Sequence, residues 1–185
     1  MSTLFSYVVD HDIGFAPNPF GGYCTLVHCK YQGFSNRRNI VELADERDWI
    51  LDTGGKGRES AGNNKIIYLM QVDEKLSFRD YLSDERFRGR SDREDFSEGN
   101  EFALVSKTFY YFGKNALDIS ELPEYLQPCL LVKKGPGFRS DYPAQLLNKL
   151  CEWFANIYEF GMHSNPCTSE KENIKPRKRL TTRSN

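Results

Sequence analysis

One apolar run constrains the fold of this chain more than any other segment. Residues Lys65–Val72 read KIIYLMQV and are nearly continuous in apolar side chains, as in a central strand that is covered on both of its faces. Shorter segments rich in β-branched and aromatic residues predict further strands. These segments are Phe5–Val9, Tyr23–Cys29, Trp49–Leu51, Lys107–Gly113 and Cys129–Val132. We therefore expect a sheet of short strands around Lys65–Val72.

The predicted helices are short, with one exception near the C-terminus. An amphipathic helix is predicted at about 142–160, with Asp141 as its N-cap, Pro143 in its first turn and Gly161 at its end. Its apolar stripe follows helical spacing and consists of Leu146, Leu147, Leu150, Trp153, Phe154, Ile157, Tyr158 and Phe160. The short helices are predicted at Arg37–Ala44, Ser77–Leu82 and Pro123–Leu126.

The order of these elements indicates a fold class. Strands that do not alternate regularly with long helices disfavour a doubly wound parallel sheet. We expect an α+β fold, a small, mostly antiparallel and partly closed β-barrel with peripheral short helices and one C-terminal amphipathic helix. Two polar segments, Lys56–Asn64 and Arg86–Asn100, are predicted to be exposed loops.

The length of 185 residues suits one globular domain, predicted at residues 1–167. Residues 168–185 hold six basic and two acidic residues and almost no apolar ones. They are predicted to be a disordered basic tail. A contact of Lys175–Arg179 with nucleic acid is one alternative for this tail.

Composition agrees with a soluble globular protein. Charged residues make up 28% of the sequence and hydrophobic residues 39%, and no apolar run reaches the length of a membrane span. The N-terminus lacks the basic and apolar regions of a signal peptide. The five cysteines are an odd number, which favours free thiols. We expect a cytoplasmic protein with no membrane contact.

Neither a metal nor a cofactor is expected. Cys24, His28 and Cys29 are close in sequence, but Cys29 points away from the other two if they lie in one strand. No further pair completes a zinc site. We therefore expect Cys24 and Cys29 to be small packing residues. The segment Gly54–Gly57 follows a strand but lacks the spacing of a phosphate-binding loop.

Two segments of the chain contain no acidic residue, namely Ile13–Val41 and Tyr125–Ser140. Their basic residues include Lys30, Arg37, Arg38, Lys133, Lys134 and Arg139. If the two segments meet in space, they form a positive face suited to phosphate groups, with Lys133, Lys134 and Arg139 as phosphate ligands. Short acid-free windows also occur by chance, and that alternative stays open.

The segment Asp10–Lys30 has the composition of a loop that holds one shape around a ligand. Pro17 and Pro19 restrict the backbone on both sides of Asn18, which leaves a preset amide that can donate and accept at a base edge. Phe20 beside two glycines provides an aromatic plane. The candidate ligand-binding residues are Asp10, Asn18, Phe20, Thr25, Lys30, Trp49 and Tyr111.

Candidates for catalysis are fewer. Asp10 and His11 belong to the one sequence cluster with acid–base potential, in which His11 lies between Asp10 and Asp12 and one of the two carboxylates orients its imidazole. A turn after the first strand, with Asp10 bonding backbone amides, is the favoured alternative. Cys24 or Cys29 is a candidate nucleophile, which requires a lowered pKa and a base partner. In the aromatic run, Tyr111 is expected to face away from its two neighbours.

Many short matches in order make the chain similar to a known family. Phe5–Lys30 resembles the F-x-Y-V-V…D-x-G-F-A-P-N-P-F-x-G-x-C-T-L-x-x-C-K line of the nucleotide modification associated domain 2 family. Further matches span roughly 4–140. They are Asp48–Trp49 with Gly54–Gly55, Ile67–Val72, Phe78–Phe87, Phe109–Gly113 and Gly135–Arg139. Arg47 stands where the family has the glycine of a GDW motif, and 90–100 departs from its usual acidic insertion.

This resemblance implies an association with base modification in nucleic acids and with bacterial or phage conflict systems. It also implies a fold similar to the PUA, ASCH and EVE barrels, which often hold a modified or flipped base in an aromatic pocket. Three functions remain open at this stage. The first is a nucleotide or modified-base binding module with nucleic acid or a nucleotide as partner. The second is an enzyme acting on a nucleotide or base, and the third is a regulatory subunit that docks a protein through the C-terminal helix or tail.

Overall fold

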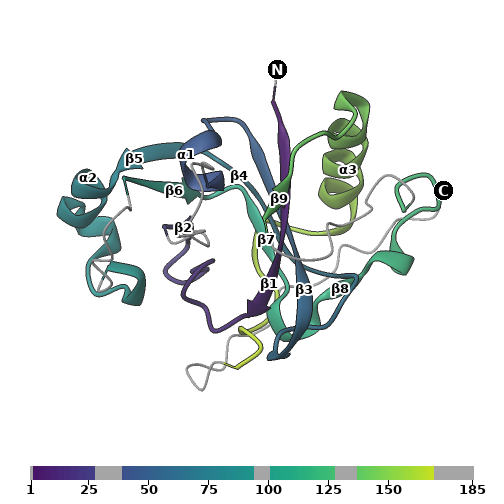
Figure 1. The fold of residues 1–185 in the computed structure, drawn as a ribbon, viewed down its shortest axis with the longest axis horizontal. Coiled ribbons are helices and arrows are strands. Elements are labelled where there is room, and N and C mark those ends of the chain that lie inside the picture. Colours follow the sequence, from purple (N-terminus) through teal and green to yellow (C-terminus); the bar gives the residue numbers. More distant parts are fainter. Residues whose placement is uncertain (1, 28–38, 94–100, 128–136, 169–185) are drawn as a thin grey trace.

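Two β-sheets form the core of the structure, a computed structural model that describes residues 2–27, 39–93, 101–127 and 137–168 (Figure 1). The larger sheet has the strand order β10-β7-β4-β3-β1-β9, with β8 paired to β4, and the smaller sheet has the order β2-β6-β5. The larger sheet comprises β1 (Leu4–His11), β3 (Trp49–Glu59), β4 (Lys65–Gln71), β7 (Phe109–Tyr111), β8 (Leu117–Asp118), β9 (Phe138–Arg139) and β10 (Gly161–Met162). The smaller comprises β2 (Cys24–Leu26), β5 (Glu74–Ser77) and β6 (Phe102–Ser106).

The helices of the described residues are few and mostly short. The α-helices are α1 (Ile40–Leu43), α2 (Phe78–Ser83) and α3 (Ala144–Ile157). The 3-10 turns are η1 (Glu85–Phe87), η2 (Ser91–Arg93), η3 (Gly113–Asn115) and η4 (Ile119–Glu121). None of these described helices has both the length and the hydropathy needed to cross a bilayer.

The predicted α+β class is confirmed, and the apolar run at β4 lies inside the larger sheet as expected. Among the described strand pairs, β1 with β3 and β7 with β10 are parallel, and the others are antiparallel. Both sheets are open in their strand order, from β10 to β9 and from β2 to β5. The predicted partly closed barrel of the PUA, ASCH and EVE type is therefore not confirmed.

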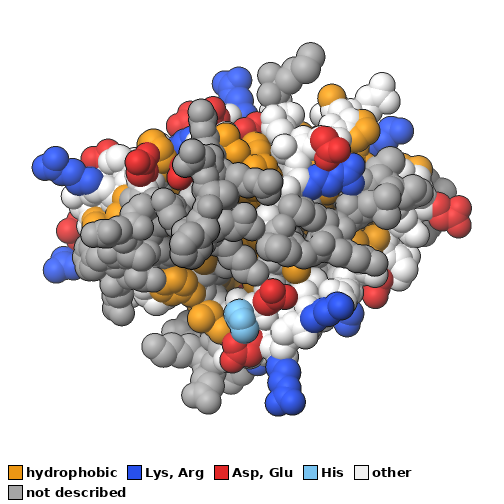
Figure 2. Space-filling view, viewed as in Figure 1, with side chains coloured by type: hydrophobic (Ala, Val, Ile, Leu, Met, Phe, Trp, Pro, Cys, Tyr) orange, Lys and Arg blue, Asp and Glu red, His pale blue; other side chains and the backbone are white. Residues whose placement is uncertain are grey.

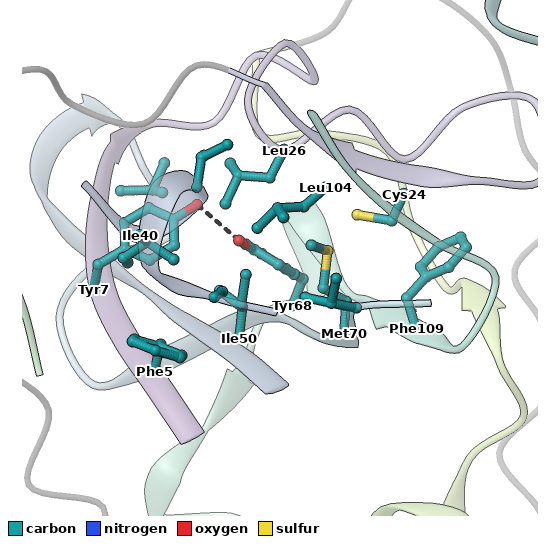
Figure 3. Close-up of a cluster of buried hydrophobic side chains, with 14 of the residues drawn as sticks. Phe5, Tyr7, Cys24, Leu26, Ile40, Ile50, Tyr68, Met70, Leu104 and Phe109 are labelled. Carbon is teal, nitrogen blue, oxygen red and sulfur yellow. Dashed lines mark hydrogen bonds between the residues drawn. The ribbon is translucent and has the colours of Figure 1, made fainter. Parts of the chain in front are cut away.

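The larger sheet has one face toward the smaller sheet and the other toward α3 (Figure 1). On the inner face, Phe5, Ile50, Met70 and Phe109 pack with Leu26 and Leu104 of the smaller sheet (Figure 3). On the outer face, α3 covers Leu4, Trp49, Leu51, Leu69, Tyr110 and Phe112. The alternation expected in the aromatic run is confirmed, because Tyr111 belongs to the inner cluster and its two neighbours to the outer one.

Helix α3 is shorter than predicted. It begins after Pro143, which is its N-cap, and it ends at Ile157, so Asp141 does not cap it. The Asp141 carboxylate instead accepts a hydrogen bond from Arg139 Nε at 2.5 Å. Phe160 lies beyond the helix with 44% of its surface exposed. The segment predicted as a helix at Pro123–Leu126 forms a turn instead, closed by Leu126 N donating to Pro123 O at 2.8 Å.

Both segments that we expected to be exposed loops contain regular structure among their described residues. Strand β3 does not stop at its glycines but continues to Glu59. In the described part of the charged segment, 86–93, Phe87 and Asp92 are buried, and only 8% of the Arg90 side chain is exposed. The prediction of a solvated insertion is wrong for Phe87, Arg90 and Asp92, since Phe87 packs in the interior and the charges of Arg90 and Asp92 face each other at 3.6 Å. It holds for Arg88, whose side chain is 78% exposed.

Candidate functional site

The connection between β1 and β2, residues Asp12–Tyr23, is held in place by Arg90; we call it the clamped loop. Arg90 Nη1 donates to the Phe20 carbonyl oxygen at 2.5 Å, and Arg90 Nη2 donates to the Asn18 carbonyl oxygen at 2.7 Å. Arg90 Nη2 also donates to Thr25 Oγ1 at 2.9 Å. A planar guanidinium presents several donors in a fixed geometry, so one side chain fixes two loop carbonyls and the following strand.

Arg90 lies next to a buried carboxylate, on the face of the smaller sheet that points away from the larger sheet. Arg90 Nε lies 3.6 Å from Asp92 Oδ1, and none of the Asp92 side chain is exposed. Tyr81 OH donates to Asp92 Oδ1 at 2.9 Å, and the Thr25 hydroxyl donates to Asp92 Oδ2. Burial raises the pKa of Tyr81, which therefore remains a donor. Helix α2 and the turn η2 thus bring the Tyr81 hydroxyl and the Asp92 carboxylate together beneath the loop.

The loop also has internal hydrogen bonds. The backbones of Asn18 and Thr25 pair through two bonds of 2.9 Å, and Asn18 Oδ1 accepts from Phe20 N at 3.3 Å. Only 2% of Asn18 is exposed. Its side-chain oxygen therefore shapes the loop, and the structure does not present this amide to solvent as the sequence suggested.

The outer part of the clamped loop is open to solvent. Ile13 is 50% exposed, Phe20 is half-buried, and Gly21 and Gly22 are exposed. At Gly14, an added Cβ would lie 2.7 Å from both the Phe20 ring and the Pro166 ring, and φ is +74°. Only glycine fits there, because the Phe20 ring and the Pro166 ring both pack close to this position.

The base of the clamped loop is a buried carboxyl. Asp12 is 1% exposed; its carboxyl accepts from Tyr111 OH and from Cys167 N, the latter at 3.0 Å. Burial raises the pKa of Asp12, although the hydrogen bonds from Tyr111 and Cys167 oppose the shift. Burial also raises the pKa of Tyr111 well above its ordinary value. This site ties the loop to β7 and to the C-terminal segment.

In wild type, the titration of Asp12 lowers the free energy of unfolding as pH rises. Replacing Asp12 by asparagine is expected to abolish this decrease. The pKa of Asp12 in the folded chain lies above the unfolded value of 3.8. At pH values between these two pKa values, the folded chain binds more protons than the unfolded chain. The free energy of unfolding therefore falls as pH rises through this range. Relative to wild type, Asp12→Asn should therefore gain stability from pH 3.8 upward. Urea unfolding at a series of pH values measures this difference.

Asp118→Asn is the control of opposite sign. Hydrogen bonds from Ser120 lower the pKa of Asp118, so the wild-type residue stabilises the fold above its unfolded pKa and this contribution is lost as pH falls. The variant should lose stability relative to wild type toward higher pH. Parallel pH profiles for wild type and Asp12→Asn would contradict the raised pKa of Asp12.

A row of polar side chains crosses the inner face of the larger sheet next to Asp12. Tyr7, Asp52, Tyr68 and Tyr111 are cross-strand neighbours on β1, β3, β4 and β7. The hydroxyls of Tyr7 and Tyr68 are 2.7 Å apart (Figure 3), and Asp52 is fully buried between these strands. Sequence reasoning missed that Asp12 is buried, and it missed Asp52 altogether; the signal available for Asp52 was an aspartate within the apolar stretch of β3.

The structure separates some of the predicted ligand-binding residues. Trp49 lies on the outer face of the larger sheet under α3, whereas Tyr111 lies on the inner face. Trp49 therefore does not join Asn18, Phe20 and Thr25 in one site. The alternation of side chains explains the difference. Successive residues of a strand point to opposite faces of the sheet, and here one face packs on the smaller sheet and the other on α3.

The remaining candidates are placed as follows. His11 Nδ1 lies 2.9 Å from Glu59 Oε2, with both side chains more than half exposed; Asp12 points to Tyr111 instead of orienting His11. Asp10 is half-buried and lies against Gly55. Arg139 lies on edge strand β9, 4.3 Å from the Tyr142 ring centroid. Lys30, Lys133, Lys134 and Cys29 lie outside the described residues.

Neither cysteine chemistry nor metal binding finds support in the described residues. Burial raises the pKa of the Cys24 thiol strongly, the opposite of what a nucleophile requires. Among residues 2–27, 39–93, 101–127 and 137–168, no three His, Cys, Asp or Glu side chains are grouped as metal ligands. On the face seen in Figure 2, the Lys and Arg side chains of the described residues are scattered and form no single patch.

Fold and site together define an α+β domain with two open sheets, a buried polar row and one rigidly held loop. Residues 1–97 and 91–173 match the family model described as nucleotide modification associated domain 2. The chain therefore belongs to this family, as the resemblance indicated, and the family's name links it to nucleotide modification. No curated protein and no solved structure matches the chain.

Several family-like motifs have structural roles. Arg47 has φ of +76°, which explains a glycine at this position of the family's GDW motif. Asp48 accepts from Thr3 N at 2.7 Å and from Asp45 N at 3.0 Å. Tyr81, in the F-x-x-Y motif, bonds the clamp residue Asp92. These contacts give the GDW-like motif and the F-x-x-Y motif a role in folding.

Proposed function

We propose that the domain binds a nucleotide or a modified base on the clamped loop, as a module of nucleic-acid modification or phage-conflict systems. One observation supports this: a buried arginine directs its donors to two carbonyls of a loop whose outer part is open to solvent. A buried ion pair contributes little net stability compared with apolar packing. A loop that is already ordered, however, loses less conformational entropy when it binds a ligand.

The chemistry of the loop suits a flat heterocycle that carries a phosphate. The half-buried Phe20 offers a ring for base stacking. Two residues later, Gly22 has no atom within 4 Å of an added Cβ, which leaves room for a close approach. Beyond the glycines, the Tyr23 ring lies 5.1 Å from Lys107 Nζ and 5.6 Å from the Arg86 guanidinium. Lys107 is exposed and is the cation we expect to contact the phosphate.

Phe20→Ala tests this proposal. Stacking of a base on an aromatic side chain is worth about 1–3 kcal/mol, so the variant should bind about 5- to 150-fold more weakly. The measurement is calorimetric titration with a panel of modified and unmodified nucleoside monophosphates. Because both tryptophans pack on the α3 side, calorimetry is preferable to tryptophan fluorescence.

Phe160→Ala is the matched control. Phe160 is also a partly exposed aromatic residue, but it packs on Tyr110 with ring centroids 4.8 Å apart, on the other side of the larger sheet. Its replacement should leave nucleotide affinity unchanged. The proposal fails if no nucleotide of the panel binds saturably, or if Phe20→Ala binds as tightly as Phe160→Ala.

A further inference from the structure

The C-terminal segment of the described chain, residues 161–168, runs from the edge of the larger sheet to the base of the clamped loop. It begins as β10, which pairs in parallel with β7, and His163 N donates to the Tyr111 carbonyl oxygen at 2.7 Å. The backbone and side chain of Thr168 both donate to the Asp12 carbonyl oxygen at 3.2 Å. The segment is therefore bonded to the first residue of the loop.

Within this segment, the residues on both sides of Pro166 are hydrogen-bonded. Lys114 N donates to the Asn165 carbonyl oxygen at 2.8 Å, and Cys167 N donates to Asp12 Oδ2 at 3.0 Å. Pro166 itself is buried, and burial of a proline side chain costs almost no conformational entropy. The Pro166 ring is thus a rigid apolar surface whose position is set by its two neighbours.

Pro166 meets the ring that we expect to stack on a base. An added Cβ on Gly14 would lie 2.7 Å from Pro166 Cγ and 2.7 Å from Phe20 Cε2, so these two ring carbons are no more than twice that distance apart. Gly14 has φ of +74° and no side chain, which leaves the space in which the two rings approach each other.

A partly exposed ring benefits from such a neighbour when it binds a ligand. Side chains in contact with solvent change rotamer rapidly, and fixing one of them on binding reduces affinity. Phe20 is half-buried. If its ring already packs on a rigid surface in the free protein, it loses less of this freedom when a base stacks on it.

We infer that Pro166 is a positioning residue of the loop site, which holds the Phe20 ring in the orientation that stacks on a base. The inference rests on the proposed function and adds the C-terminal segment to its site. Pro166 acts through Phe20, so its contribution is confined to ligands that carry a base. The contact of a phosphate with Lys107 does not depend on it.

Calorimetric titration of Pro166→Ala, which lacks the γ-carbon, tests this inference in the full-length chain. The Kd of the nucleoside monophosphate that wild type binds most tightly should rise about 2- to 12-fold, the effect of one side chain that is no longer fixed before binding. The affinity for ribose 5-phosphate, which has no base, should be unchanged. Pro166→Val retains γ-carbons and should bind the nucleotide more tightly than Pro166→Ala. Pro143→Ala, at an exposed proline before α3, is the matched control and should bind as wild type.

A double variant shows whether Pro166 acts through the ring. In a Phe20→Ala background, Pro166→Ala should cause no further loss of nucleotide affinity, because the ring that it positions is absent. An equal loss in the two backgrounds would mean that Pro166 affects binding through the fold as a whole, and it would overturn the inference.

NMR relaxation of the Phe20 ring in the ligand-free protein gives a test that requires no ligand. The order parameter of the ring should be lower in Pro166→Ala than in wild type. An unchanged order parameter, or wild-type affinity of Pro166→Ala beside weakened binding by Phe20→Ala, would overturn the inference and leave the loop site supported. Absence of saturable binding by wild type would contradict the proposed function and, with it, any positioning role in binding.

Discussion

Arg90→Met is expected to destabilise the fold by about 3–5 kcal/mol, the usual effect of removing one partner from a buried ion pair. The substitution leaves the Asp92 carboxylate buried without its cation, and it leaves the carbonyls of Asn18 and Phe20 without their donors. Unpaired buried acceptors add to the loss. Equilibrium unfolding in urea, followed by circular dichroism, measures the change.

Two other substitutions make this result specific. Arg88 pairs with Glu85 at 3.3 Å, but 78% of its side chain is exposed, so Arg88→Met should change stability by about 0.5 kcal/mol or less. Arg90→Lys retains the charge without the planar fork. Its loss of stability should lie between those of Arg88→Met and Arg90→Met. Equal stability of Arg88→Met and Arg90→Met would show that the clamp does not hold the fold.

A second substitution separates the shape of the loop from the stability of the fold. Adding Asp92→Asn to Arg90→Met removes the unpaired charge and keeps one oxygen to accept from Tyr81 or Thr25. Because the two sites are in contact, the double variant should recover part of the lost stability. It should not recover nucleotide affinity, since the carbonyls of the clamped loop still lack their donors. Such a result would show that the main role of Arg90 and Asp92 is to hold the conformation of the loop, and that stabilising the fold is secondary.

Local sequence patterns predicted the parts of the fold that depend on neighbouring residues. The apolar run at Lys65–Val72 gave an interior strand, and alternation placed Tyr111 opposite Tyr110 and Phe112. The helical stripe of α3 was also identified, and Leu146, Leu150 and Phe154 are buried on it. In each case a periodic pattern within a short window reports which face is buried.

The clamp was not predictable in this way because its partners are distant in sequence. Arg90 and Asp92 occur in a charge-dense segment that reads as solvated, yet they contact the clamped loop and the start of β2, which lie 65 to 72 residues away. The bond between Asp12 and Cys167 spans 155 residues. A single sequence shows that such residues are charged or polar, but only the tertiary arrangement decides whether a partner neutralises them in the interior.

Strand β3 was cut short in the prediction because its glycines were interpreted as a stop. In the structure these glycines allow backbones to approach closely: a Cβ on Gly54 would overlap the Gly62 carbonyl and lie 2.7 Å from Gly62 N, and one on Gly57 would lie 3.1 Å from the Asp10 carbonyl carbon. Glycine within a strand often marks such a contact. The family-like Gly54–Gly55 pair therefore has a packing role beside the base of the clamped loop.

Gly54→Ala should consequently destabilise the fold by about 3 kcal/mol, because two backbones must separate to admit the methyl group. For a chain of this length, that corresponds to a fall in Tm of about 6–12 °C. Gly22→Ala is the matched control: φ there is +80°, but no atom lies within 4 Å of an added Cβ. Its effect is conformational only and should be about 1 kcal/mol. Since φ at Gly54 lies outside the left-handed region, a smaller effect there than at Gly22 would mean that β3 and the Gly62 turn are not in contact.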